Sequence, residues 1–220
     1  MVARILHVKS YGQRCPLARA LDLVGERWTL LVIRELLLGP RRYTDLLDGL
    51  PGVGTNILGA RLGDLQEAGL VNKRTLPPPT AVTVYELTDA GRALRPAIRA
   101  LSEWGEQHGA PATQSQQIRP AWILTTLTRR PATLEAGRAC ELRVGRDVFE
   151  LSNTHGELSI AARSATSPDA VVTIEPKLLY GLAAGRITPG AARGRVDIDG
   201  DPALADQVLI ALGGSVAATP

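Results

Sequence analysis

The chain has 220 residues, enough for one large domain or two small ones. Its 45% hydrophobic and 21% charged residues are typical of a globular protein and exclude a disordered chain. The formal net charge of +3 arises in residues 1–110, which hold 14 Lys and Arg against 11 Asp and Glu, whereas residues 111–220 hold 11 of each. A polyanionic partner would therefore meet the first half of the chain.

Two helices are predicted at the start of the chain. The first begins at Cys15-Pro16, because proline lacks the N–H that the first helical position leaves unpaired, and it ends at Gly25. Leu17 and Leu21 lie on its apolar face. The second is predicted from about Glu26 to Leu38, and the apolar stripe that includes Trp28 is broad enough for burial on most sides.

The segment Tyr43 to Ala68 is predicted to form two helices joined by a tight turn at Pro51–Gly54. Each helix carries an apolar stripe at helical spacing, formed by Leu46, Leu47 and Leu50 in the first and by Ile57, Leu58, Leu62 and Leu65 in the second. This is the pattern of a helix-turn-helix unit, whose second helix enters the major groove of DNA.

After Gly69 the spacing of the apolar residues changes from that of a helix to the alternation of a strand. Leu70–Thr75 and Val82–Leu87 are predicted strands, and the prolines of the intervening segment favour a stiff hairpin tip, so the unit has the winged form. A further helix is predicted from Arg92 to Gly109, with Thr88 as a plausible N-cap. Its seam of Leu94, Ile98, Leu101 and Gly105 is as consistent with packing on its own domain as with self-association.

The second half is predicted to be a separate α+β domain. Residues 1–110 are assigned to the first domain, 111–116 to a polar linker and 117–220 to the second domain. The elements expected in the second domain are a helix over Ala121–Thr128, strands over Arg138–Val144, Val148–Ser152, Leu158–Ala162 and Ala170–Glu175, a helix over Lys177–Ala184, a strand over Gly194–Ile198, and a last helix with Asp201 as N-cap and Pro202 at its first position.

A string of spaced residues in the first half resembles a known family. They are Cys15-Pro16, Trp28, Gly39, Arg42-Tyr43, Leu46, Leu58, Arg61-Leu62, Leu65, Gly69-Leu70-Val71, Tyr85, Leu87-Thr88 and Gly91. Residues 12–108 are thereby similar to the HxlR-type winged helix-turn-helix regulators, relatives of the MarR group. The resemblance implies a bacterial repressor or activator that acts as a dimer. The chain departs from the family pattern within the second helix of the pair, at Gly59 and Gly63. Each glycine lowers helix stability by about 1 kcal/mol relative to alanine. Relatives often have a cation at the position of Gly63.

The second half resembles sterol-carrier-protein-like domains. The resemblance rests on Pro168-Asp169 before a strand, the Gly185 turn, and Gly194-x-Val196-x-Ile198-x-Gly200-Asp201 before the terminal helix. It implies an apolar cavity and therefore a small apolar effector, although many such domains use the fold only for packing.

The predicted DNA contacts follow from the helix-turn-helix reading. Thr55 and Asn56 open the second helix of the pair and are expected at base edges, where asparagine can pair with adenine. Arg61, one turn further on, is expected either at base or phosphate or across the domain's own surface. Phosphate contacts are expected from Arg41, Arg42, Lys73 and Arg74.

Two further kinds of site are predicted in the first domain. The dimer is expected to form through the first helix and the seam, with Leu17, Leu21, Leu94, Ile98 and Leu101 as contact residues. Cys15 precedes a helix, where the dipole favours a thiolate, and some family members are similar in sensing oxidants through a cysteine at this place. The alternative for Cys15 is a small capping residue.

Motifs for catalysis or metal binding do not emerge from the sequence. Asp197–Asp201 is not a calcium loop, because Pro202 and Val208 stand where such a loop needs glycine and glutamate. The three histidines are scattered, and Cys15 and Cys140 give no disulfide framework. We therefore expect no enzyme activity, cofactor, metal or membrane partner, and a cytoplasmic protein. The alternative to a DNA-binding regulator is a lipid or small-molecule carrier with a helical interaction module.

Overall fold

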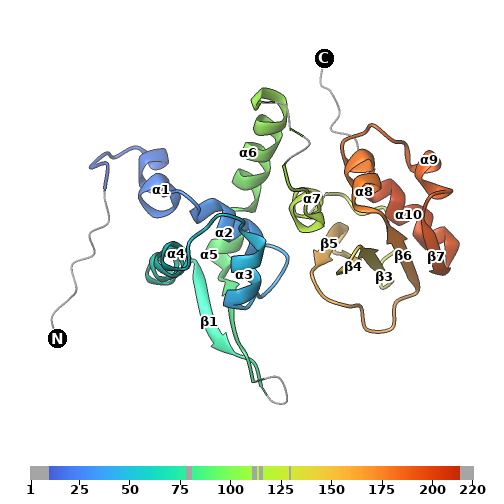
Figure 1. The fold of residues 1–220 in the computed structure, drawn as a ribbon, viewed down its shortest axis with the longest axis horizontal. Helices are drawn as coiled ribbons and strands as arrows, with labels where there is room; N and C mark the ends of the chain where they lie inside the picture. Colours follow the sequence, from blue (N-terminus) through green and yellow to red (C-terminus); the bar gives the residue numbers. More distant parts are fainter. Residues whose placement is uncertain (1–9, 78–80, 111–112, 114–115, 129, 214–220) are drawn as a thin grey trace. The chain divides into compact units, whose positions relative to one another are not determined.

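The computed structural model describes residues 10–77, 81–110, 113, 116–128 and 130–213 (Figure 1). Within it the chain forms two compact units, one ending at Glu103 and the other beginning at Trp104. The predicted linker, residues 111–116, lies largely outside the described residues, so its role stays a prediction. The mixed α+β fold class is confirmed.

The N-terminal unit is built from helices and a two-stranded hairpin, in the order expected for a winged helix-turn-helix. The helix-turn-helix pair and the wing are both present where the sequence predicts them. The elements are α1 (Pro16–Val24), α2 (Thr29–Leu36), α3 (Tyr43–Gly49), α4 (Thr55–Glu67), β1 (Val71–Thr75), β2 (Thr83–Leu87), α5 (Asp89–Arg92) and α6 (Arg95–His108), whose residues from Trp104 onward belong to the second unit.

One apolar core holds these helices together. Leu46 of α3 and Leu58, Leu62 and Leu65 of α4 are almost completely buried, as the helical spacing predicts. Ile57 is a correction, because its side chain is exposed rather than on the buried face of α4. The periodicity misplaced it because the buried stripe of this helix is narrow.

The second helix begins later than predicted, at Thr29 instead of Glu26. Trp28 is its N-cap and has a left-handed backbone with φ 79°, a conformation that is strained for a bulky residue. Its ring packs against the core, and a Cβ added at Gly52, in the turn between α3 and α4, would lie 3.9 Å from the ring atom Cη2. The connection between α1 and α2 therefore packs close to the turn of the helix pair.

The wing is an antiparallel hairpin that pairs Val71 with Leu87 and Thr75 with Thr83. A third segment joins it, because the backbone of Arg41 exchanges two hydrogen bonds with Tyr85, of 2.9 and 2.8 Å. This contact ties the start of α3 to β2. The predicted proline tip is the segment 76–81, of which residues 78–80 lie outside the described residues.

The predicted helix from Arg92 to Gly109 is in fact two helices. Thr88 is confirmed as an N-cap, since its hydroxyl accepts from the N–H of Gly91, but α5 ends at Arg92 and α6 begins at Arg95. Pro96 explains the break, because its ring would clash with the carbonyl of Arg92 in a continuous helix, whereas proline is tolerated in a first turn.

The C-terminal unit is a five-stranded sheet with helices. The strand order is β5-β4-β3-β6-β7, in which β3 and β6 are parallel and the other neighbours are antiparallel. The elements are α7 (Pro120–Leu127), β3 (Ala139–Val144), β4 (Asp147–Thr154), β5 (Glu157–Ala161), β6 (Ala170–Ile174), α8 (Pro176–Ala183), α9 (Pro189–Arg193), β7 (Asp197–Gly200) and α10 (Pro202–Leu212).

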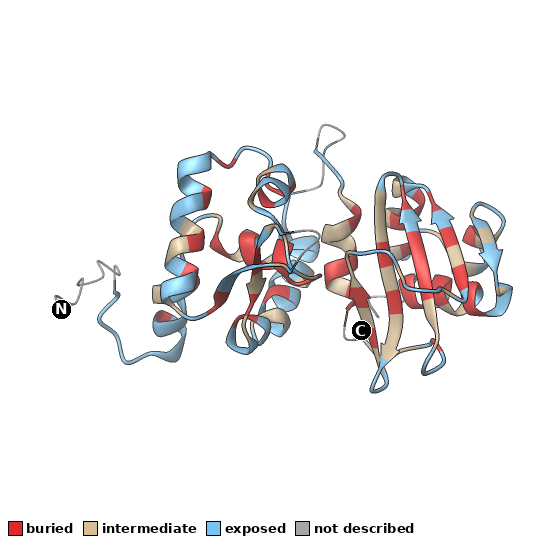
Figure 2. Cartoon of the chain, turned by 90° about the horizontal axis from the view of Figure 1, so that it is seen from below, coloured by how far each residue is buried: buried red, intermediate tan, exposed pale blue. Residues whose placement is uncertain are grey.

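One face of this sheet carries the core of the unit. Buried residues alternate with more exposed ones along β4, β5 and β6 (Figure 2), and α7 and α10 pack against the sheet. Leu142, Leu151 and Val172 on the strands are fully buried. The fully buried Leu179 and Val208 on α8 and α10 belong to the same unit.

The segment before the last helix differs from its prediction. A strand was expected from Gly194 to Ile198, but β7 begins later and covers Asp197–Gly200. A short helix that was not predicted, α9, comes before it and ends at Arg193. Thr188 begins α9 by accepting a hydrogen bond from the N–H of Ala191. The Asp201 cap is confirmed, since its carboxylate accepts from the N–H groups of Ala203 and Leu204.

Within the part of the chain that the structure describes, every helix is too short or too polar to span a bilayer.

Candidate DNA-binding interface

The start of α4 presents the two residues predicted to reach base edges. Thr55 and Asn56 occupy the first two positions of the helix and both are exposed. The hydroxyl of Tyr43, at the start of α3, donates a 2.7 Å hydrogen bond to the carbonyl of Thr55. This bond fixes the beginning of α4 against α3, and no local sequence pattern indicates it.

The two arginines before α3 differ in their surroundings. Arg42 is exposed, and its backbone N–H donates to the carboxylate of Asp45 in the first turn of α3. Arg41 is partly buried through its backbone pairing with Tyr85, and its Nε is buried without a hydrogen-bond partner among the described residues. Arg42 is therefore the more accessible of the two for a phosphate.

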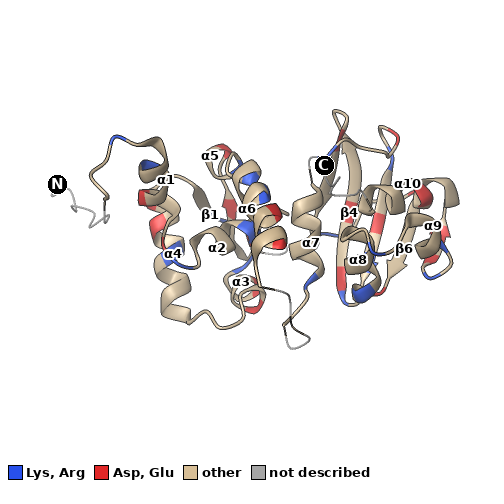
Figure 3. Ribbon diagram, turned by 90° about the horizontal axis from the view of Figure 1, so that it is seen from above, with Lys and Arg blue, Asp and Glu red and all other residues tan. Residues whose placement is uncertain are grey.

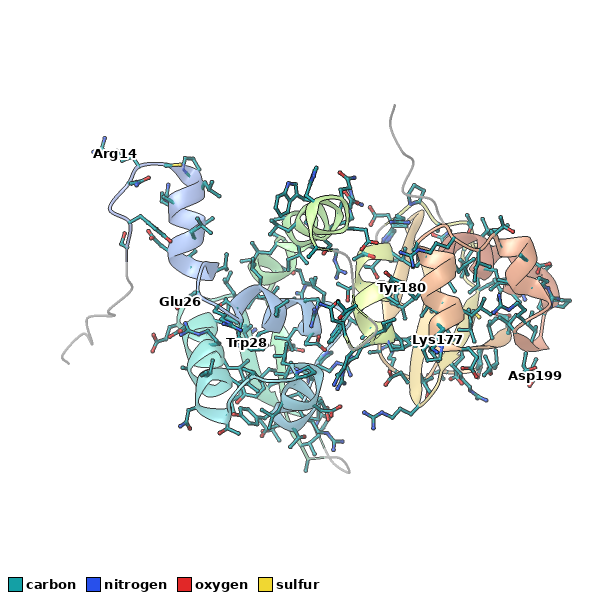
Figure 4. The ribbon with its side chains drawn as sticks, turned by 45° about the horizontal axis from the view of Figure 1, so that its top comes forward. Arg14, Glu26, Trp28, Lys177, Tyr180 and Asp199 are labelled. Atoms are coloured by element: carbon teal, nitrogen blue, oxygen red, sulfur yellow. The ribbon has the colours of Figure 1, made fainter. Side chains whose placement is uncertain are left out.

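In the chain without DNA, Arg61 lies across the surface of its own domain. Its Nη1 is 2.7 Å from Oδ2 of Asp64, and its Nη2 is 3.7 Å from Oε2 of Glu26. Glu26 and Trp28, both labelled in Figure 4, come from the connection between α1 and α2. The Arg61 guanidinium thus links α4 to this connection.

The cations of the wing also have partners within the wing. Arg74 Nε is 2.8 Å from Oε1 of Glu86 on the opposite strand. The ammonium of Lys73 lies 5.7 Å from the centre of the Tyr85 ring, within cation–π range. Both cations are exposed, and basic and acidic residues are interspersed along the ribbon of the N-terminal unit (Figure 3).

The residues predicted for the dimer separate into two groups. Leu17 and Leu21 of α1 are 67% and 37% exposed, and Leu101 of α6 is 54% exposed, so these apolar side chains are available to a partner. Ile98 is a correction, since it is buried in the core of its own unit, and Leu94 packs partly buried against the same core. The seam is therefore divided between the core and the surface.

The two cysteines lie in opposite environments. Cys15 is the exposed N-cap of α1 and makes no side-chain hydrogen bond with that helix. Cys140 is buried on β3, and burial raises the pKa of its thiol to about 12. Of the two thiols, only that of Cys15 is accessible to an oxidant in the folded chain.

Comparisons with known proteins agree with these features. Residues 23–113 match the HxlR-like helix-turn-helix family, and residues 135–211 match the SCP-2 sterol transfer family. The chain is 39% identical over 100 residues to an HTH-type transcriptional regulator of Synechocystis sp.. The matched region covers 44% of this chain and 74% of that protein. The two family matches confirm the resemblances seen in the sequence.

A second relative is the HTH-type transcriptional regulator YodB of Bacillus subtilis. It is 31% identical over 98 residues, covering 44% of this chain and 88% of YodB. The solved structure of reduced YodB from B. subtilis matches with a TM-score of 0.40 and 29% identity, covering 46% of this chain and 100% of that chain.

Proposed function

Because the chain belongs to the HxlR-like helix-turn-helix family, we propose that it is a sequence-specific DNA-binding transcriptional regulator, a homodimer on a palindromic operator. The observation that carries this proposal is the exposed start of α4, where Thr55 and Asn56 face outward. Asparagine there can form two hydrogen bonds with adenine, and the threonine methyl can contact thymine.

Cations that come before and after α4 in the sequence would contact the phosphate backbone. Arg42 precedes α3, and Lys73 and Arg74 lie on the wing, all on exposed positions. Such contacts fix the register of a protein on the duplex without reading its sequence. Discrimination between sequences would then depend on Thr55 and Asn56.

The exposed leucines of α1 and α6 support the homodimer. Leu17, Leu21 and Leu101 would bury apolar surface between two copies of the chain. A two-fold dimer requires a palindromic operator, with half-sites about one helical turn apart, roughly 10 base pairs between centres or a multiple of that.

The second unit is proposed to bind a small apolar effector, on the basis of its match to the SCP-2 sterol transfer family. An effector that weakens DNA binding must itself bind more weakly to the DNA complex. Equal effector affinity with and without operator would rule out this coupling. If the chain bound a lipid but never a duplex, the carrier function would replace the regulatory one.

Cys15 is proposed as the site of a redox response, and the protein is proposed to act in the cytoplasm without enzymatic activity. The exposure of the Cys15 thiol at a helix start supports the redox role. The test compares DNA affinity before and after oxidation in wild type and Cys15→Ser. An identical loss of affinity in both proteins would exclude this role.

The experiment for DNA binding begins by isolating the genomic fragments that the purified chain retains. Wild type and Asn56→Ala are then titrated against a retained fragment and a scrambled duplex at several salt concentrations. Asn56→Ala should cost about 1–3 kcal/mol on the retained fragment and little on the scrambled one. An equal loss on both duplexes would contradict the assignment of α4 to the groove.

A further inference from the structure

Two guanidinium groups on the proposed DNA-binding face are paired with carboxylates of the chain itself. On α4, Nη1 of Arg61 lies 2.7 Å from Oδ2 of Asp64. On the wing, Nε of Arg74 lies 2.8 Å from Oε1 of Glu86. Carboxylate and phosphate oxygens bind the same planar fork of the guanidinium group. Each carboxylate therefore occupies a place that a DNA phosphate would need.

The backbone brings the members of each pair together. In the wing, Arg74 pairs with Val84 and Asn72 pairs with Glu86, so Arg74 and Glu86 are diagonal neighbours on one face of the hairpin. Arg61 and Asp64 are three residues apart on a helix, a spacing that makes them surface neighbours. Both pairs therefore follow from the register of the fold.

The wing pair is the more accessible of the two to a polyanion, because the side chains of Arg74 and Glu86 are 45% and 27% exposed. In the α4 pair, Asp64 is 57% exposed and Arg61 is 20% exposed. Surface ion pairs are weak, so a phosphate can displace the carboxylate, and the competition lowers affinity by about two- to fivefold per pair.

We infer that Asp64 and Glu86 compete with DNA phosphates for Arg61 and Arg74 and so hold down the sequence-independent part of DNA affinity. This inference rests on the proposed DNA-binding function. In the complex, each guanidinium either exchanges its carboxylate for a phosphate or keeps the carboxylate and neutralises no phosphate. Both cases give a lower affinity than the number of cations alone implies, and they leave discrimination to the start of α4.

The test uses the full chain and a random-sequence duplex of roughly 30 base pairs, about three helical turns. Glu86→Gln should bind this duplex about two- to fivefold more tightly per protomer. The slope of log K against log salt should become steeper by up to about 0.9, the value for one added phosphate contact. Asp64→Asn should change both quantities in the same direction. As Asp64 is the more exposed carboxylate, its variant keeps the test valid if Glu86→Gln unfolds.

Glu103→Gln is the matched control, because Glu103 pairs with Arg99 on α6, outside α4 and the wing, with 3.6 Å between Nε and Oε1. The Glu103→Gln substitution changes the net charge by the same amount as Glu86→Gln, and it should alter the affinity for the duplex less than Glu86→Gln does. Arg74→Ala should remove the gain in the Glu86→Gln background and have a smaller effect in wild type.

Equal changes in Glu86→Gln and Glu103→Gln would mean that net charge explains the effect. The inference would then be overturned, while duplex binding by wild type would leave the proposed function standing. Failure of wild type to bind any duplex would overturn the proposed function and this inference with it.

Discussion

Tyr43 joins the two helices of the proposed DNA-binding pair through one hydroxyl group. The bond from this hydroxyl to the carbonyl of Thr55 is 2.7 Å long and lies near the surface. The substitution Tyr43→Phe removes this hydrogen bond. It should lower the free energy of unfolding by about 0.5–1 kcal/mol, the lower part of the range for a single hydrogen bond. Urea unfolding measures this change. Tyr11→Phe is the control, because the Tyr11 hydroxyl has no hydrogen-bond partner within the described residues, and an equal loss in both variants would contradict the role of Tyr43.

Cys140 makes the stability of the C-terminal unit depend on pH. Burial raises the pKa of this thiol from 9.0 to about 12, so the folded chain keeps the proton over a range in which the unfolded chain loses it. The resulting contribution to stability is complete below about pH 9 and is lost as the pH rises toward 12.

The free energy of unfolding should therefore fall by up to about 1.4 kcal/mol per pH unit within that window because of this group. Unfolding of wild type and Cys140→Ala between pH 8 and pH 11, values that bracket the ordinary and raised pKa, isolates the contribution. Parallel curves for the two proteins would show that Cys140 does not titrate differently on unfolding.

At the level of the helices and strands, local signals predicted the fold well. The proline at the start of α1 and the caps at Thr88 and Asp201 act within a few residues, so the sequence alone places them. The break between α5 and α6 was missed although Pro96 marks it, because Leu94, within the break, lies at helical spacing from Ile98 of α6. The short helix α9 was missed because its five residues are too few to show a helical period.

The contacts of the candidate interface were less predictable. Arg61 reaches Glu26 across 35 positions of the chain, and Arg74 reaches Glu86 only through the register of the hairpin. No local pattern reveals such partners, since they depend on how the elements pack. The sequence therefore predicted which cations lie near α4 and the wing, but not that Glu26 and Glu86 accompany them.

The helix α4 carries two glycines that its own fold does not require. Gly59 and Gly63 have helical backbones, and a Cβ added to either would meet no atom within 4 Å. Gly59→Ala and Gly63→Ala should each raise the free energy of unfolding by about 0.5–1 kcal/mol, because alanine loses less backbone entropy in a helix. Thermal or urea unfolding measures the gain.

Gly91→Ala is the control for these substitutions. Gly91 also lies in a helix, α5, but its Cβ would overlap the carbonyl oxygen of Leu70, so alanine should destabilise the chain. Loss of stability in Gly59→Ala or Gly63→Ala would indicate a packing role for that glycine.

At the level of the whole molecule, the proposed dimer depends on exposed leucines. Leu17→Glu should convert the dimer into a monomer with little loss of stability, because the side chain is already 67% exposed in the single chain. Ile210→Glu, at an exposed apolar residue of the C-terminal unit, should leave the dimer intact. Sedimentation equilibrium gives the mass of each species. A monomeric wild type that still binds duplex DNA would refute the dimer.

The parallel pair of β3 and β6 bears on the order in which the two units fold. In the wing, Arg74 pairs with Val84, only 10 residues later, whereas Cys140 pairs with Ala170, 30 residues later. Closing the longer loop costs more chain entropy before any contact compensates for it. β7 then pairs Gly200 with Ala170, so the sheet cannot be completed until the ribosome has released residue 200. The N-terminal unit can therefore fold during synthesis while the strands of the second unit still wait for their partners.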